Sequence, residues 1–419
     1  MHRNRVSCGW VIGALGALTL SCSVAAADSK SPVPLYLHGS AAPEPWQRYA
    51  DWNKARWDTY NTLANRKLTA PPAPPKEIKG RIDGDPKNGQ SLAFARDRGG
   101  GCLACHVMGP ATPEVPGNVG PDLSEIGAAG RPDEYLFNYI YDAQALNPGS
   151  VMPPWGAHGF YNEAEIRDIV AFLKTLKTPA KFKDDLDDPT KRPKPVEDRD
   201  ALDPFVNPAV DHIDTGAALM RAAGPTGKSC VACHADPKTA FTGWAATMPR
   251  WDPRLKKVLG VEEFIYRHAK VTTGAEYRMQ SAENIDLTVY LHSLSNGEPI
   301  RLDLASTEAK AALARGEELY RAKIGQLNFA CADCHTAEKG ANKWLRGQYL
   351  GEPRGQYDHF PNYRTSRSEI WDIRKRLQWC NIQVRANELP PDAPEYGELE
   401  LYLASLSQGL TLTTPNIRH

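Results

Sequence analysis

The chain lacks an excess of either charge, with 50 lysines and arginines against 50 aspartates and glutamates. This balance argues against binding to nucleic acid and against a general affinity for anionic membranes. Long apolar runs are also missing, because the run near the N-terminus, from Trp10 to Leu20, is too short for a stable membrane anchor. We therefore expect no nucleic-acid partner and no membrane span.

The first residues have the pattern of an export signal. Arg3 and Arg5 precede the apolar run, and Ala25-Ala26-Ala27 forms a small-residue cleavage site after it. We expect residues 1–27 to be a signal peptide and the mature protein to be periplasmic, in a compartment where thiols are easily oxidised.

Cysteine is scarce, and almost all of it is accounted for. Six of the nine cysteines stand in three Cys-x-x-Cys-His motifs, the pattern that attaches c-type haem. Both thiols bond to the porphyrin, and the histidine supplies an iron ligand. A structural zinc site would need a second Cys or His pair for each motif, and none is suitably spaced. The motifs predict three covalent haems, held by Cys102, Cys105 and His106, by Cys230, Cys233 and His234, and by Cys331, Cys334 and His335.

The same two segments flank each motif, which indicates a triplicated domain. Before the motifs stand Gly89-x-x-Leu92, Gly216-x-x-Leu219 and Gly316-x-x-Leu319. After them stand amphipathic segments that begin at Asp168, Asp286 and Glu398 and carry apolar residues at helical spacing. A first helix, a haem motif and a last helix in this order resemble class I cytochromes c. We therefore expect a mainly α protein with three class I cytochrome c-like haem domains and long loops.

The repeats also set the expected domain boundaries. Residues 28–80 form an N-terminal extension, whose tryptophans Trp46, Trp52 and Trp57 we expect to pack rather than to recognise a partner. Residues 181–208 are charged and proline-rich without periodicity, which is typical of a linker on the surface. The haem domains are expected at 81–180, 209–300 and 301–419.

The second axial position of each haem iron sets its potential. In the first domain, Met152 lies in a loop stiffened by prolines and is the expected ligand, with His158 as the alternative. A methionine ligand raises the potential, which suits an exit point for electrons. In the second domain His268, Met279 and Met248 are all candidates.

The third domain contains no methionine, since the last in the chain is Met279. The candidate ligands after His335 are His359, Cys380 and His419. Cys380 is the one cysteine left after the signal peptide and the haem motifs are counted. An unpaired thiol in an oxidising compartment is a liability unless it is used. We expect Cys380 to ligate this haem as a thiolate.

The stretch from Lys343 to Arg385 is strongly cationic, with nine basic residues against four acidic ones. Cations near a thiol lower its pKa, and they also attract small dianions. Because the stretch surrounds Cys380, we interpret it as part of a functional site rather than as a solvated face.

The order of these features resembles that of the SoxXA cytochromes of bacterial thiosulfate oxidation, with a SoxX-like monohaem part fused to a SoxA-like dihaem part. The SoxX resemblance rests on Asn88-Gly89, Cys102-x-x-Cys105-His106, Gly120-Pro121-Asp122-Leu123 and Val151-Met152-Pro153-Pro154. The SoxA resemblance rests on Met248-Pro249-Arg250-Trp251-Asp252-Pro253, Trp344-x-Arg346-Gly347-Gln348, Phe360-Pro361-x-Tyr363-Arg364 and Arg376-Leu377-Gln378-Trp379-Cys380.

This resemblance implies that Cys380 ligates the active-site haem, can carry a persulfide, and acts with Arg376, which contacts the anion. It implies the activity of an L-cysteine S-thiosulfotransferase, which joins thiosulfate oxidatively to a cysteine of a SoxYZ-like carrier and passes the electrons to a small cytochrome c. Where many SoxA proteins have a cysteine ligand, this chain has His268. That departure implies bis-His ligation of the second haem, or a swap to Met279.

Two other functions remain open at this point. The chain could be a periplasmic trihaem subunit that only transfers electrons, which would need neither the thiol nor the cationic stretch. It could also be a relative of the dihaem peroxidases, which would need an open or displaceable sixth position on one iron.

Overall fold

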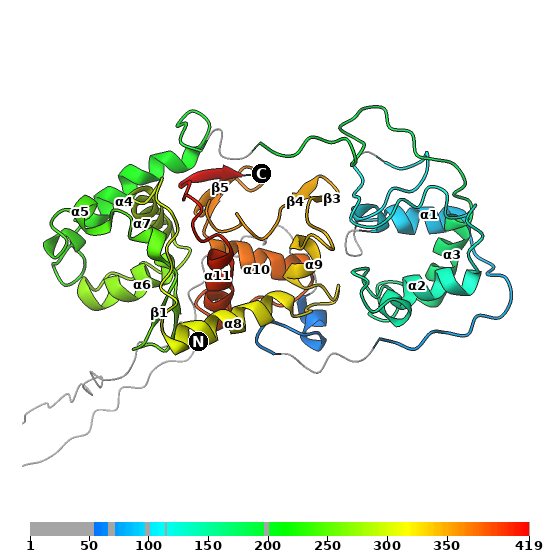
Figure 1. The fold of residues 1–419 in the computed structure, drawn as a ribbon, viewed down its shortest axis with the longest axis horizontal. Helices are drawn as coiled ribbons and strands as arrows, with labels where there is room; N and C mark the ends of the chain where they lie inside the picture. Colours follow the sequence, from blue (N-terminus) through cyan, green and yellow to red (C-terminus); the bar gives the residue numbers. More distant parts are fainter. Residues whose placement is uncertain (1–53, 66–71, 97–100, 114, 197–200, 419) are drawn as a thin grey trace, which may run out of the picture.

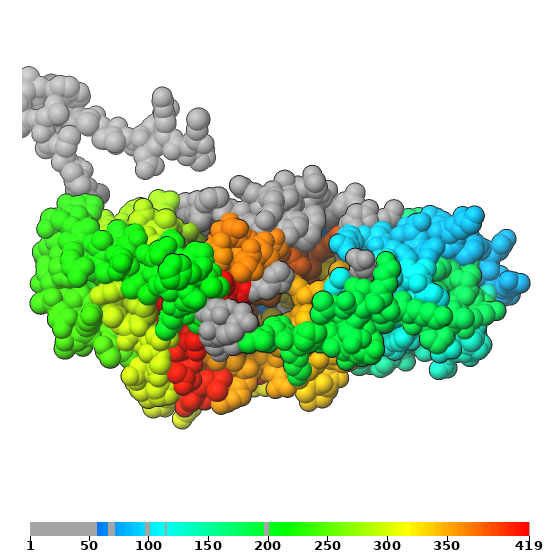
Figure 2. All heavy atoms as spheres, turned by 90° about the horizontal axis from the view of Figure 1, so that it is seen from above, coloured from blue at the N-terminus to red at the C-terminus, as the bar shows by residue number. Residues whose placement is uncertain are grey.

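The computed structural model describes residues 54–65, 72–96, 101–113, 115–196 and 201–418, so the export signal, Trp46, Trp52 and His419 lie outside the described residues. Three helical units lie in a row, one around each Cys-x-x-Cys-His motif (Figure 1). The unit with the third motif lies between the other two, as the view from above also shows (Figure 2). Among the described helices, none is long and apolar enough to cross a bilayer.

Each unit is built on one pair of crossing helices. The pairs are α1 (Pro86–Phe94) with α3 (Glu163–Leu173), α4 (Asp211–Arg221) with α7 (Ala282–Ser293), and α8 (Thr307–Arg321) with α11 (Pro394–Leu406). The motifs follow the first helix of each pair as the short helices η3 (Cys102–Ala104), η5 (Cys230–Ala232) and α9 (Cys331–His335). The expected order of first helix, haem motif and last helix is confirmed.

Glycine makes each crossing possible. A Cβ atom on the glycine would lie 1.9 Å from the backbone oxygen of the partner helix for Gly89 and Asp168, 2.2 Å for Gly216 and Asp286, and 2.1 Å for Gly316 and Glu398. No side chain fits at that separation, so these backbones come together only where the Cβ is missing. The glycines and their partners are the residues that define the sequence repeat.

Side-chain caps fix where several of these helices begin. Asn162 accepts a hydrogen bond from the backbone N–H of Glu165, and the Glu165 carboxylate accepts one from the N–H of Asn162. This reciprocal capping box starts α3. Ser281 and Ser306 start α7 and α8 in a simpler way, each accepting one backbone N–H.

Smaller elements fill the loops between the crossing pairs. The further helices are α2 (Asp133–Leu146), α5 (Pro237–Phe241), α6 (Val261–Thr272) and α10 (Ile373–Gln383), with 3-10 turns at Lys54–Thr59, Pro208–Val210 and Ala245–Thr247. Two antiparallel hairpins pair β1 (Arg250–Asp252) with β2 (Lys257–Leu259) and β3 (Lys343–Leu345) with β4 (Gln348–Leu350). A small sheet places β5 (Asn362–Arg364) between antiparallel β6 (Glu369–Trp371) and parallel β7 (Asn416–Arg418).

The second and third units also pack directly on each other. Val258 of β2, in the second unit, is buried against Ala312 of α8 and Leu401 of α11, in the third. Tyr357 of the third unit donates a 2.9 Å hydrogen bond to the carbonyl oxygen of Met248 in the second. The β1–β2 hairpin of the second unit therefore packs against both crossing helices of the third unit.

The N-terminal extension and the linker both bind to the third unit. Trp57 is buried against Trp371 and Trp379, so the described tryptophan of the extension packs as expected. The linker runs over the surface, where the Arg192 guanidinium lies 4.8 Å from the centre of the Trp344 ring. The Arg192 guanidinium also donates a 2.9 Å hydrogen bond to the carbonyl oxygen of Arg346.

Candidate functional site

The histidines of the first and third motifs are oriented by backbone carbonyls. Nδ1 of His106 lies 2.7 Å from the oxygen of Pro121, and Nδ1 of His335 lies 2.8 Å from the oxygen of Gly351. A carbonyl only accepts, so the contact of His106 favours a proton on Nδ1 and leaves the Nε2 lone pair for a metal. Nδ1 of His335 lies between the Gly351 oxygen and the amide nitrogen of Gln356, which is 2.6 Å away. A Cβ on Gly120 would lie 2.3 Å from the His106 ring, so this glycine packs directly on the imidazole. Both motifs fit a haem iron.

The histidine of the second motif faces another histidine. The ring centres of His234 and His268 are 6.2 Å apart, and the His268 ring stacks on Phe264 at 5.1 Å. Two neutral imidazoles that face each other at this distance could both serve as ligands of a haem iron. Met248 and Met279, the other two candidates, are both buried. The arrangement is consistent with an iron held between two imidazoles.

The candidates near the first motif have different neighbours. Met152 is partly buried and packs against the core of the first unit. Nδ1 of His158 lies 2.7 Å from the oxygen of Gln326, which belongs to the third unit. His158 is therefore engaged at the contact between two units, whereas Met152 packs within the first unit.

Cys380 lies on α10, partly buried, and its charge interacts with the third motif. The pKa of the Cys331 thiol is raised to about 12, by burial first and by Cys380 second. The pKa of the Cys334 thiol is raised by burial and then by the charges of Cys105 and Cys380. The fold thus brings the expected ligand to the third motif, although the role of Cys380 stays a prediction.

Arginines gather around this thiol. Arg364 on β5 is buried, and burial, followed by the charge of Arg376, lowers its pKa to about 9. Its Nε has no hydrogen-bond partner within the described residues. Burial lowers the pKa of His335 to about 4, and Arg376 adds to the shift. A buried cation with an unsatisfied N–H beside a second arginine is a suitable place for an anion.

The residues of the cationic stretch divide between buried ion pairs and the surroundings of Cys380. Arg374 is fully buried and pairs with Glu400, outside the stretch. Lys375 lies 3.2 Å from Glu369. The small sheet brings a further cation close to Cys380. Arg418 on β7 lies directly opposite Arg364 on β5 in the strand register, although it is outside the cationic stretch in sequence. The remaining candidate ligand His359 stacks on its neighbour Phe360 and has Nδ1 3.0 Å from the oxygen of Gly355.

The first unit meets the third unit at the first haem motif. Asn118 and Trp344 exchange two hydrogen bonds, of 2.9 Å and 2.8 Å. The backbone N–H of Arg346 donates a 3.0 Å bond to the oxygen of Ala104, which lies inside the first motif. These bonds place the first motif against the β3–β4 hairpin of the third unit.

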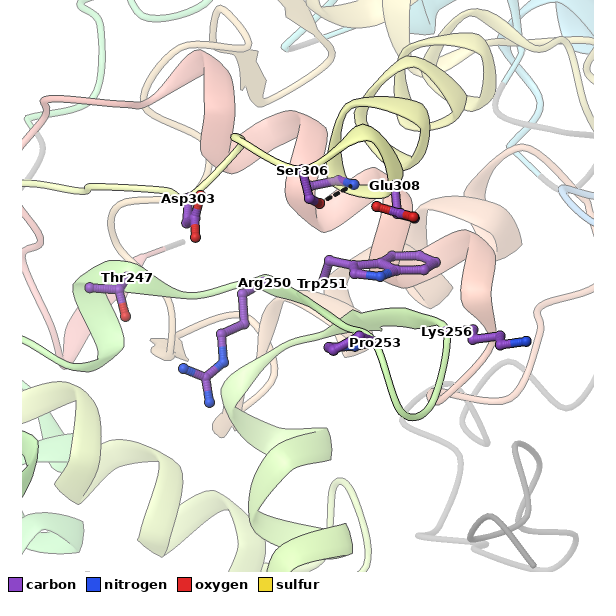
Figure 3. A pocket seen from close by; sticks show the side chains of 9 residues that line it. Thr247, Arg250, Trp251, Pro253, Lys256, Asp303, Ser306 and Glu308 are labelled. Atoms are coloured by element: carbon purple, nitrogen blue, oxygen red, sulfur yellow. Dashed lines mark hydrogen bonds between the residues drawn. The ribbon is translucent and has the colours of Figure 1, made fainter.

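A cleft of the described residues lies away from this site. It has a volume of about 680 Å³ and is lined by Arg250, Trp251 and Lys256 of the β1–β2 hairpin and by Ser306 and Glu308 at the start of α8 (Figure 3). None of the expected haem ligands lines it. Within the described residues, no group of three or more His, Cys, Asp or Glu side chains is placed to hold a separate metal ion.

A buried group of charged side chains joins the second unit to the third. Glu263 of α6 receives hydrogen bonds from Lys257 at 2.6 Å and from Arg267 at 2.7 Å. Arg374 of α10 lies 3.6 Å from the other Glu263 oxygen and also bonds to Glu400 of α11. Removing one member of such a group leaves an uncompensated buried charge, which costs about 3–5 kcal/mol.

Glu262 lies beside this group but forms no ion pair with the described residues. Its pKa is raised well above the ordinary value of 4.5, by burial first and then by the charges of Glu400 and Asp372. The folded protein therefore keeps a proton that the unfolded chain releases above that pH.

We expect Glu262→Gln to flatten the pH dependence of stability. Because the folded state binds the extra proton, the free energy of unfolding falls as pH rises above 4.5, by at most about 1.4 kcal/mol per pH unit for one group. Glutamine cannot ionise, so the variant gains stability over the parent as pH rises. Urea unfolding between pH 5 and 8 measures this, with exposed Glu338→Gln as the control. Parallel curves for parent and Glu262→Gln would contradict the expectation.

Comparison with known proteins places this geometry in a family. Residues 215–300 and 315–412 match the family model described as SoxA/TsdA, cytochrome c domain. Residues 85–173 match the model described as Cytochrome C oxidase, cbb3-type, subunit III. All three units thus correspond to cytochrome c domains, the class that holds haem covalently.

Individual relatives agree with the second and third units. The L-cysteine S-thiosulfotransferase subunit SoxA of Pseudaminobacter salicylatoxidans is 33% identical over 52% of this chain and 75% of its own length. The subunit of the same name from Paracoccus pantotrophus is 31% identical over 52% of this chain and 73% of its length. The crystal structure of SoxXA from P. pantotrophus aligns with a TM-score of 0.48 and 28% identity, covering 51% of this chain and 80% of that chain. The chain therefore belongs to the SoxA family of L-cysteine S-thiosulfotransferase subunits, with a further cytochrome c domain before the family region.

Proposed function

We propose that this protein is a periplasmic trihaem cytochrome that oxidatively conjugates thiosulfate to a cysteine of a SoxYZ-like carrier and passes the electrons to a small cytochrome c. The observation that carries the proposal is the position of Cys380. Its thiol lies beside the third haem motif and interacts with Arg364, whose buried Nε has no partner among the described residues. A thiol, an anion site and a haem motif together are what joining two sulfur atoms requires.

Each haem has a set of residues suited to hold it. Haems bound at the three motifs would accept electrons one at a time and pass them on. The axial pairs that we propose are His106 with Met152, His234 with His268, and His335 with Cys380. The carbonyl beside Nδ1 of His106 supports the first pair, and the 6.2 Å separation of the imidazoles supports the second over a swap to Met279. The closeness of Cys380 to the third motif supports the third pair.

Arg364 and Arg376 would bind and orient the thiosulfate dianion. Their positive charges stabilise an anion most effectively where burial limits competing water, and Arg364 is 8% exposed. The Cys380 thiolate and the terminal sulfur of thiosulfate then form an S–S bond and release two electrons. The carrier thiol attacks the sulfur that came from thiosulfate, takes over the S–S bond and returns its proton to the leaving Cys380 sulfur.

Electrons would leave through the first unit. The bond from Arg346 N–H to the oxygen of Ala104 supports this route, because it brings the first motif against the third unit. The expected methionine ligand of the first haem also supports it, since methionine ligation raises the potential.

The direct test is thiosulfate-dependent reduction of cytochrome c, with and without a carrier whose cysteine is accessible. We expect reduction to require the carrier and the carrier mass to rise by one thiosulfate group. Tetrathionate formation without a carrier would instead show that two thiosulfate ions are joined. A high-spin ferric site together with peroxide turnover would favour the peroxidase alternative, and failure with every sulfur substrate would favour the electron-transfer subunit.

We expect the intact mass of the mature protein to exceed that of its polypeptide by three haem groups. The expectation follows from the three motifs, each of which has its own crossing helix pair. Mass spectrometry of periplasmic protein measures it, with the Cys230→Ala/Cys233→Ala double variant as the control that should lose one haem. A parent mass with two haems would contradict the count.

We expect Arg376→Ala to weaken the use of thiosulfate about tenfold or more while leaving the haem spectra nearly unchanged. The charge of Arg376 repels those of Arg364 and protonated His335, so the substitution removes a repulsion from the folded site rather than an attraction. A charge-assisted bond to an anion contributes about 1.5–3 kcal/mol. The KM for thiosulfate measures the loss. Arg321→Ala, which removes a surface arginine on α8, is the control, and equal KM values for the two variants would refute this role.

A further inference from the structure

The helix that carries Cys380 has a polar face that is buried. Arg374, Gln378 and Asn381 follow each other at the i, i+4, i+7 spacing of one helix face, and they are 0%, 5% and 4% exposed. A buried helix face is ordinarily apolar, because burying polar groups costs free energy unless each finds a hydrogen-bond partner. This face of α10 therefore needs an explanation beyond packing.

Every side chain of this face is held by a directed bond. Arg374 bonds through Nε to Glu400 and donates from Nη1 to the oxygen of Pro391 at 3.0 Å. Gln378 donates to the oxygen of Leu389 at 2.8 Å. Asn381, the third residue of the face, donates a 3.2 Å hydrogen bond to the hydroxyl of Tyr396. We call Arg374, Gln378 and Asn381 the polar anchor of α10.

The polar anchor lies opposite the residues of the proposed active site. An α-helix turns by about 100° per residue, so Arg376 and Cys380, four apart, share a face. Arg374 and Gln378 each precede one of them by two residues, which places them roughly 200° around the axis. Any rotation of the helix on its anchored side therefore moves Arg376 and Cys380 by a similar angle on the other.

Two residues of the second unit complete the anchor. The Gln280 side chain donates a 2.8 Å hydrogen bond to Oε1 of Gln378. Glu263 of α6 lies 3.6 Å from Nη1 of Arg374 and is itself fixed by Lys257 and Arg267. The helix of the third unit is thus held in part from the neighbouring haem unit.

We propose that Arg374, Gln378 and Asn381 are positioning residues that set the rotation of α10, and so aim Cys380 and Arg376, with Gln280 and Glu263 of the second unit as part of the same device. The inference rests on the proposed function, because it concerns the site that Cys380 and Arg376 would form. It also gives the second unit a part in the reaction that does not depend on electron transfer through its haem.

Directional bonding is the physical reason for a polar rather than an apolar face. Apolar packing is non-directional, and apolar cores that are repacked lose a unique arrangement before they lose stability. Hydrogen bonds weaken steeply when they bend, so several of them fix one rotation. Buried ion pairs often stabilise no more than hydrophobic residues of the same volume, and a role in specifying one arrangement is the better-supported use.

The test uses the full-length, haem-loaded protein and the variants Gln378→Met, Gln280→Ala and Arg374→Met. We expect each to broaden or split the low-spin ferric electron paramagnetic resonance signal of the haem at His335, and to lower kcat/KM for thiosulfate about tenfold. Gln280→Ala is the most telling variant, because it alters the third unit from the second. Lys270→Met, on the exposed side of α6, is the control and should match the parent.

The outcomes separate this inference from the proposed function, because Cys380→Ala is assayed beside the other variants. If Gln378→Met and Gln280→Ala match the parent in signal and in kcat/KM, while Cys380→Ala is inactive, the positioning role is wrong and the function stands. If Cys380→Ala stays active, the proposed function is wrong, and the split signal alone decides on positioning. If Arg374→Met does not fold, the two glutamine variants still decide.

Discussion

Replacing Cys380 by alanine is expected to lower thiosulfate oxidation about a thousandfold or more, with all three haems still attached. The variant removes the sulfur that would form the bond to thiosulfate, and no other cysteine outside the haem motifs remains in the described chain. Attachment should survive, because it depends on the motif cysteines. Thiosulfate-dependent reduction of cytochrome c in the presence of a carrier measures the rate, and the intact mass measures the haems.

A matched variant separates ligation from chemistry. Cys380→Met keeps a sulfur atom at the same place on α10 but cannot form a disulfide, so we expect it to be as inactive as Cys380→Ala. If Cys380 is an iron ligand, the two variants should nevertheless differ in the spectrum of the haem at His335. Near-normal turnover in Cys380→Ala would refute the catalytic role. If Cys380→Met is active and Cys380→Ala is not, Cys380 serves only as an iron ligand.

The features that could be predicted from the sequence are local or periodic. The haem motifs lie within five residues each, and the last helices show their spacing in one segment. The sequence also showed that each unit has a glycine before the motif and an acidic residue after it, such as Gly316 and Glu398. The structure explains the repetition, because the two helices of each unit cross at these positions. What the repeat could not show is that the glycine and the acid meet, since they lie some 80 residues apart.

The site around Cys380 was predictable in composition but not in orientation. Net charge in a stretch does not tell which side of a helix a cation is on. Arg374 counted toward the cationic stretch, yet its partners Glu263 and Glu400 are distant in sequence and bury it. Arg418, by contrast, lies outside the stretch and reaches the site because β7 pairs with β5.

Contacts between units were beyond sequence reasoning. The β3–β4 hairpin that meets the first haem motif has strands of three residues, too short to show alternation of apolar and polar side chains. Its bond from Arg346 to Ala104 uses only backbone atoms on the first unit's side, which any residue supplies. Within the second unit, His268 was already a candidate ligand in the sequence, and the 6.2 Å between its ring and that of His234 is what supports the proposed pair.

Gly316→Ala is expected to destabilise the third unit by about 3 kcal/mol or more, which makes it the strongest single perturbation of the fold that the repeat suggests. The new Cβ would lie 2.1 Å from the oxygen of Glu398 and 2.9 Å from the Cβ of Tyr402, so α8 and α11 must move apart. Overpacking usually costs 1–3 kcal/mol, and here the obstacle is backbone rather than a flexible side chain.

Hydrogen–deuterium exchange locates the effect of Gly316→Ala. We expect faster exchange in α8 and α11, with α1 and α3 unchanged, because the first unit has its own crossing at Gly89 and its own core. Gly149→Ala is the matched control, since the atom nearest to its Cβ is 3.5 Å away. Uniformly faster exchange in all three units would mean that they do not fold as separate haem domains, and exchange equal to that of the control would mean that the helices tolerate separation. Either result would contradict a fold in which each haem motif depends on one glycine crossing.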